Sequence, residues 1–118
     1  MAEIAQLMRA TLHEVFGERD PEKRRAAIAR TYHPDVAFAD PDTTVTGHDA
    51  LDAKAQSILD GAPGFVFAPV GEPYVSDDLG YQPWQLGPEG GPPVVRGVDI
   101  ALVRDGKIAK LHTFLLRD

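Results

Sequence analysis

Three stretches of the chain place apolar residues at helical spacing. Residues 4–16 repeat them at steps of three and four, which lines one face of a helix. In residues 20–31, Asp20 and Pro21 fit the N-cap and the first position of a second helix. Residues 48–61 predict a third helix that stops at its terminal glycine. Its expected inner face consists of Leu51, Ala55, Ile58 and Leu59.

The rest of the chain alternates apolar and polar positions and predicts strands. The stretch "YHPDVAFADP" gives an opening strand, and "DTTVTG" after it indicates a turn. Pro83 lies inside one later strand and places that strand at an edge or at a bulge, because proline has no amide hydrogen to donate. The later strands are expected at about residues 65–70, 74–76, 81–86, 94–104 and 107–116.

This order of elements predicts an α+β fold. Three helices come first, then one isolated strand and a long antiparallel meander, so the helices should cover one face of a curved sheet. Such a sheet closed by helices forms a cone. Its mouth would be a concave apolar cavity, which is the usual form of a small-molecule site.

Composition and charge narrow the class of protein. The 118 residues predict one domain, 1–118, and contain no cysteine, so disulfides and thiolate chemistry are excluded. The 18 acidic against 12 basic side chains give a net charge of -6, which argues against a nucleic-acid partner. No stretch predicts a membrane span or a signal peptide, so we expect a cytoplasmic protein. The four histidines show no metal-ligand spacing, and no metal site is predicted.

Two aspartates are candidates for chemistry. Asp40 ends the opening strand directly before Pro41, which fits either an Asx turn or a reactive carboxylate facing the cavity. Asp99 lies between Val98 and Ile100 in an apolar strand, and it is either a structural partner for Arg96 or a second cavity group. If both face the cavity, burial should raise the pKa of both carboxyls.

The turn of the last hairpin decides which side chains face Asp99. A three-residue loop at "RDG" places Asp99 on one face with Ala101, Leu111, Thr113 and Leu115, and the other face then carries Ile100, Leu102, Ile108, Lys110, His112 and Phe114. A two-residue turn at Asp105-Gly106 would instead bring His112 opposite Asp99. We favour the three-residue loop.

Three motifs in order, "TYHPDVAFADP", "GHDAL" and "GVDIALVRDGKIAKLHTFL", give the chain a family resemblance. The chain resembles the nuclear transport factor 2-like superfamily, and within it the SnoaL-like and ketosteroid isomerase-like proteins. The resemblance implies the cone-shaped fold, also called a cystatin-like roll. It implies that Asp40 is a proton-shuttling base and that Asp99 is a protonated hydrogen-bond donor. The oxyanion tyrosine of the family has no counterpart, since Met8, Leu12 and Phe16 occupy the matching positions.

The functional hypothesis is therefore an enzyme without a cofactor that transfers a proton on a ketosteroid-like or polyketide-like substrate, as an isomerase, cyclase or lyase. The alternatives are a non-catalytic ligand-binding or scaffolding domain and a hydrolase that uses a cavity water. The resemblance also implies a homodimer formed through the outer sheet face, with Phe114, Leu102 and Ile108 as candidates. The predicted substrate-binding residues are Tyr32, Phe16, Leu12, Trp84, Leu111, Thr113 and Leu115.

Overall fold

The computed structural model describes residues 3–116 of the chain. Its helices are α1 (Ile4–Ala10), η1 (Thr11–Phe16), α2 (Pro21–Thr31) and α3 (His48–Asp60). The predicted first helix is present, but its last six residues form a π-helix, a wider turn that is rare and often occurs at functional sites. Asp20 caps α2 as predicted, because its side chain accepts a hydrogen bond from the Glu22 amide at 3.0 Å.

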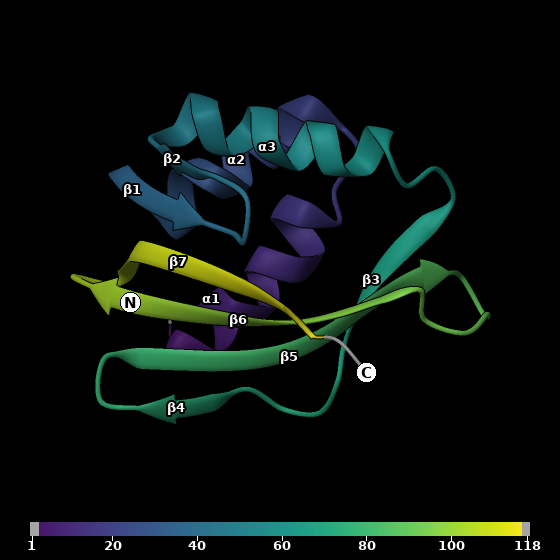
Figure 1. Ribbon diagram of the computed structural model, residues 1–118. Coiled ribbons are helices and arrows are strands. Elements are labelled where there is room, and N and C mark those ends of the chain that lie inside the picture. The colour runs from purple at the N-terminus through teal and green to yellow at the C-terminus, as the bar shows by residue number, and fades with distance from the viewer. Residues whose placement is uncertain (1–2, 117–118) are drawn as a thin grey trace.

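The strands of residues 3–116 form one seven-stranded sheet. They are β1 (Tyr32–Ala39), β2 (Thr44–Thr46), β3 (Phe65–Pro69), β4 (Tyr74–Ser76), β5 (Leu79–Pro88), β6 (Val95–Arg104) and β7 (Lys107–Leu116). The order is β2-β1-β7-β6-β5-β3, with β4 also pairing with β5. Only β1 and β7 run parallel among these pairs. Figure 1 shows the helices gathered on one side of the sheet, while β3 rises towards the end of α3. No helix among residues 3–116 is long and apolar enough to cross a membrane.

Two details of the sheet differ from the sequence-based expectation. Part of "DTTVTG" is not a turn but the short strand β2, which pairs with the end of β1. Pro83 lies in an interior strand without a bulge in its pairing to β6. It is tolerated because β5 pairs with β4 up to Tyr81 and with β3 from Trp84, so Pro83 lies in the gap between these two neighbours.

The last hairpin contains one of the two predicted turns, followed by a bulge. Asp105 and Gly106 form a two-residue turn with φ of 52° and 78°, so the three-residue loop was wrong. The register then shifts, Leu102 pairs with Lys110, and Ala109 is the extra residue of a bulge. Beyond the bulge Asp99 pairs with Thr113, so the face predicted for Asp99 is confirmed.

The two-residue turn also corrects the outer face. Ile108 was expected on that face, but the turn pairs it with Val103 on the inner face, and it is fully buried in the core. His112 pairs with Ile100 on the outer face and is exposed. The apolar core therefore takes both Ile108 and Leu111 from the same strand.

A buried ion pair joins α2 to α3. The Arg24 side chain is only 1% exposed, and its Nε donates to Asp52 Oδ1 at 2.6 Å. Its remaining nitrogens donate to the Glu18 carbonyl at 2.8 Å and to Gln56 Oε1 at 2.6 Å. Asp52 Oδ2 also accepts from Arg25, whose side chain is 71% exposed. The two helices are thus fixed by a satisfied polar contact rather than by apolar packing alone.

Candidate functional site

A cavity of about 270 Å³ lies between the helices and the inner face of the sheet. Its walls come from η1, from β1 and the turn after it, from α3, and from strands β3, β5, β6 and β7. The lining residues are Leu12, Phe16, Phe38, Asp40, Pro41, Asp42, Lys54, Ile58, Phe67, Trp84, Leu86, Val95, Asp99, Thr113 and Leu115. Seven of the nine sequence-predicted site residues lie in this wall. An engineered cavity of about 150 Å³ holds benzene, so this space is large enough for a molecule of more than one ring.

Aromatic rings form a continuous part of the wall. The ring of Phe16 lies 5.5 Å from that of Phe38 and 6.5 Å from that of Phe67, centroid to centroid. Phe67 in turn meets Trp84 edge to face at 5.3 Å. The π-helix contributes Leu12 and Phe16 to this wall. These contacts favour a flat, apolar ligand body.

Asp99 is a buried carboxyl with one oxygen held in place. Its Oδ1 accepts hydrogen bonds from Thr113 Oγ1 at 2.7 Å and from Trp84 Nε1 at 3.0 Å. No described residue donates a hydrogen bond to Oδ2. In residues 3–116, Gln82 Oε1 is the one fully buried side-chain N or O atom without a partner, so Oδ2, which also has no partner, is not fully buried. Asp99 Oδ2 is therefore open to the cavity that the residue lines. Burial raises the pKa of Asp99 to about 6, although both hydrogen bonds oppose this.

Asp40 also lines the cavity, but both of its oxygens are engaged. Oδ1 accepts from the amides of Asp42 and Thr43 at 2.9 and 2.8 Å and from the Thr43 hydroxyl at 3.3 Å. Oδ2 forms an ion pair with Lys54 Nζ at 2.6 Å. Asp40 is thus an Asx turn and a cavity residue at once.

The expected rise of the Asp40 pKa was wrong. Burial does oppose ionisation of this carboxyl. The hydrogen bond from Lys54, the amides of Thr43 and Asp42, and the charge of Lys54 together outweigh burial, so the pKa of Asp40 is lowered. The pKa values of the two aspartates are therefore shifted in opposite directions, and Asp99 is the one whose ionisation falls near neutral pH.

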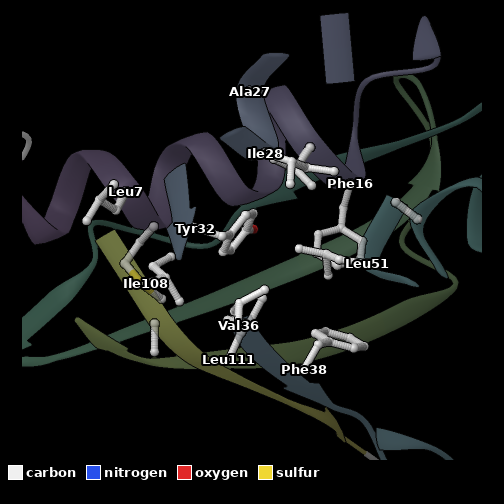
Figure 2. Packing of buried hydrophobic residues seen from close by; sticks show 14 residues of the cluster. Leu7, Phe16, Ala27, Ile28, Tyr32, Val36, Phe38, Leu51, Ile108 and Leu111 are labelled. Atoms are coloured by element: carbon white, nitrogen blue, oxygen red, sulfur yellow. The ribbon is translucent and has the colours of Figure 1, made fainter. Parts of the chain in front are cut away.

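Two predicted ligand-binding residues belong to the core instead. Tyr32 is fully buried, and Figure 2 shows its ring surrounded by the labelled core side chains. Its hydroxyl donates to Thr11 Oγ1 at 2.9 Å, and burial raises the pKa of this phenol far above its usual range. Leu111 has the predicted face, but it pairs with Phe38 of β1 and Ala101 of β6 and is covered there by the core. Neither side chain lines the cavity.

Sequence reasoning missed Lys54 and Gly97. Lys54 lies three residues after Leu51 and four before Ile58, so it shares the inner edge of α3. The signal available in the sequence was a lysine on an apolar helix face.

Gly97 faces Trp84 across the β5–β6 pair. A Cβ at Gly97 would lie 2.3 Å from Trp84 Cζ2, so only glycine lets the indole lie against the strand and reach Asp99. A glycine inside a strand often marks such an approach.

Comparison with known proteins adds a family and a fold. The family model described as the SnoaL-like domain matches residues 8–111. No curated protein sequence matches the chain. Among solved structures, a proposed isomerase of the SnoaL-like family from Agrobacterium tumefaciens superposes with a TM-score of 0.88 at 22% identity, covering 95% of this chain and 96% of that one.

Two further solved structures share the fold at lower similarity. A proposed polyketide cyclase from Sinorhizobium meliloti has a TM-score of 0.72 at 19% identity, covering 92% of this chain and 93% of that one. A proposed ketosteroid isomerase from Kribbella flavida has a TM-score of 0.67 at 17% identity, covering 97% and 78%. At these identities the likeness establishes the cone-shaped α+β fold of the nuclear transport factor 2-like proteins.

Proposed function

Because this chain belongs to the SnoaL-like domain family, we propose that it is an acid-base enzyme that moves a proton on a small, largely apolar molecule carrying a carbonyl oxygen. The observation that carries the proposal is the Asp99 carboxyl, which is buried in an apolar wall with Oδ1 fixed by two donors and Oδ2 open to the cavity. The solved structures of similar fold include a proposed polyketide cyclase and a proposed ketosteroid isomerase, and both names fit a cyclic ketone-like ligand.

The geometry supports a role for Asp99 as the group that accepts the proton. With a pKa of about 6, Asp99 is mostly ionised at neutral pH and gains a proton readily. A C–H bond next to the carbonyl breaks, its proton moves to Oδ2, and its electron pair passes to the carbonyl oxygen as an enolate. Where a carbon–carbon double bond adjoins the enolate, Asp99, now a neutral acid, can return the proton to the far carbon of the conjugated system. That return completes an isomerisation.

The base role that the resemblance implies for Asp40 stays a prediction. Its carboxylate already receives three hydrogen bonds on Oδ1 and the Lys54 ammonium on Oδ2. Each of these donors lowers the proton affinity of the carboxylate and therefore its strength as a base. Use of Asp40 as a base would require Lys54 to move away from it. Asp99 needs no such rearrangement.

Hydrogen-deuterium exchange at carbon tests the proposed function without knowledge of the natural substrate. Cyclic ketones of one to three rings are incubated with the protein in D₂O at pH 7, and loss of the signal of the hydrogens next to the carbonyl is followed by NMR. We expect faster exchange for at least one ketone than in buffer alone. If ketones bind, as shown by a change in the fluorescence of Trp84, but never exchange faster, the protein is a ligand-binding domain and the proposal fails.

The outer face of the sheet supports a second part of the proposal, a homodimer. This face carries Tyr81, Ile100 and His112 in one row across the strands, and Pro83, Val98 and Phe114 in the next. Phe114 is 53% exposed and Tyr81 42% exposed, so apolar surface remains uncovered in the single chain. We propose that a second copy covers this face.

Phe114→Lys is expected to weaken this dimer, because it places a charge in the middle of the apolar surface. Sedimentation velocity over a range of concentrations should show a shift towards monomer relative to wild type. Ala26→Lys is the matched control, since Ala26 is exposed on α2 and the substitution adds the same charge in the helical layer. A Phe114→Lys protein that associates as strongly as the control would show that this face is not the interface.

A further inference from the structure

We infer that Lys54 is the binding residue for an oxygen of the ligand that carries or develops negative charge, so that the ligand class is a ring compound with an enolate or phenolate oxygen. The inference rests on the proposed function, since it assigns the ligand's chemistry at the same cavity. It adds a recognition group that the family resemblance did not supply, because the positions matching the oxyanion tyrosine are Met8, Leu12 and Phe16.

Lys54 presents an ammonium group at the cavity wall. Its side chain is only 22% exposed. Nζ bonds Asp40 Oδ2 at 2.6 Å and the Thr43 hydroxyl at 3.3 Å. A lysine ammonium has three N–H donors, so one donor has no acceptor among the described residues. Of the side chains in residues 3–116 that line the cavity, that of Lys54 alone is cationic.

The turn after β1 fixes the position of this ammonium. Asp40 is held by the amides of Asp42 and Thr43, and its own amide donates to the Thr43 carbonyl at 2.9 Å. The carboxylate is therefore immobilised by short backbone contacts and holds Lys54 against the turn. This makes Asp40 a positioning residue for Lys54. Because four donors share the charge of Asp40, the ammonium keeps attraction for a further anion.

Lys54 and Asp99 lie on different walls. Lys54 comes from α3 in the helical layer, whereas Asp99 comes from β6 in the sheet. A ligand body between the aromatic rings can therefore meet the ammonium on one side and the open carboxyl oxygen on the other. In a water-poor apolar cavity, the attraction between an ammonium and a developing oxyanion is stronger than in water.

The test uses 2-naphthol, a flat apolar molecule with one acidic hydroxyl, and naphthalene, which lacks it. The absorbance of bound 2-naphthol is followed from pH 6 to 10, since the ionised form absorbs at longer wavelength. In the wild-type protein we expect ionisation at least about one pH unit below that of free 2-naphthol, a tenfold preference for the anion. In Lys54→Met this preference should disappear, while naphthalene should bind both proteins equally.

Two control variants keep the result decisive. Lys23→Met removes the same charge from an exposed site on α2 and should leave the preference for the anion unchanged. Lys54→Arg keeps a cation at the cavity wall and should retain most of the preference for the anion. This variant keeps the test informative if Lys54→Met fails to fold. Retention of the full preference in a folded Lys54→Met protein, or its loss in Lys54→Arg, would overturn the inference. Because ketone exchange is measured separately, the failure of this test and the failure of the proton-transfer proposal can be told apart.

Discussion

Asp99→Asn is expected to slow ketone exchange by about 10²–10⁴-fold, the usual contribution of a positioned general base. The substitution preserves shape, because the amide oxygen can still accept from Trp84 and Thr113 in place of Oδ1. The amide nitrogen that replaces Oδ2 has no lone pair available for a proton. The loss should therefore appear in the exchange rate, with the circular dichroism spectrum unchanged.

Asp40→Asn is the matched comparison in the same cavity. If Asp99 accepts the proton, removing the Asp40 charge should reduce exchange less than about tenfold, because Asp40 then acts only through the position of Lys54. If Asp40→Asn abolishes exchange and Asp99→Asn leaves it intact, the base is Asp40, as the resemblance implies. That outcome would reject the role we assign to Asp99.

The pH dependence has a definite sign. An ionised base is required, and the pKa of Asp99 is about 6, so the exchange rate should fall as the pH decreases through about 6. If Asp40 were the base instead, its lowered pKa would place the fall in rate at a pH below the usual pKa of an aspartate. Trp84, the single tryptophan of the chain, donates to Asp99, so its fluorescence should titrate near pH 6 in wild type and not in Asp99→Asn. A flat fluorescence profile would show that Asp99 does not ionise there.

Arg24→Met should lower the free energy of unfolding by about 3–5 kcal/mol, because it removes one partner of a buried ion pair. The methionine can fill most of the space of the arginine stem. Asp52, however, loses its bond at 2.6 Å, and the Glu18 carbonyl and Gln56 lose their donors. Since the Asp52 carboxylate is buried between α2 and α3, its charge is left with Arg25 alone. Urea denaturation followed by circular dichroism measures the change.

Arg25→Met provides the control on the same carboxylate. The Arg25 side chain is 71% exposed and bonds Asp52 at 3.2 Å, so its removal should cost less than about 1 kcal/mol. The double change Arg24→Met with Asp52→Leu should recover part of the loss, because no unpaired charge remains. A loss in Arg24→Met no larger than that in Arg25→Met would show that the buried ion pair is unimportant for stability.

The sequence by itself determined most of the elements and the fold class. Helical spacing in residues 4–16 and 48–60, the cap at Asp20-Pro21, and the alternation along β5 to β7 are local properties, since neighbours in the sequence are also neighbours in a helix or strand. The side chains on the face of Asp99 were predicted from a three-residue loop that is not present, and the prediction came out right because the bulge restores the register. The wall residues Leu12 and Phe16 could be named from the helical spacing of residues 4–16, and Trp84 as an amphipathic aromatic residue in a strand.

Only the tertiary structure decided what surrounds each of these side chains. The two-residue turn buried Ile108, and the bulge at Ala109 then restored the register that this turn alone would have shifted. Lys54 reaches Asp40 from an element 14 positions along the chain, which gives Asp40 a pKa opposite in direction to that of Asp99. Tyr32 is enclosed by helices that the strand pattern does not locate. The physical reason is common to all three: burial, charge and hydrogen bonding depend on groups that are distant in sequence, whereas periodicity depends on adjacent ones.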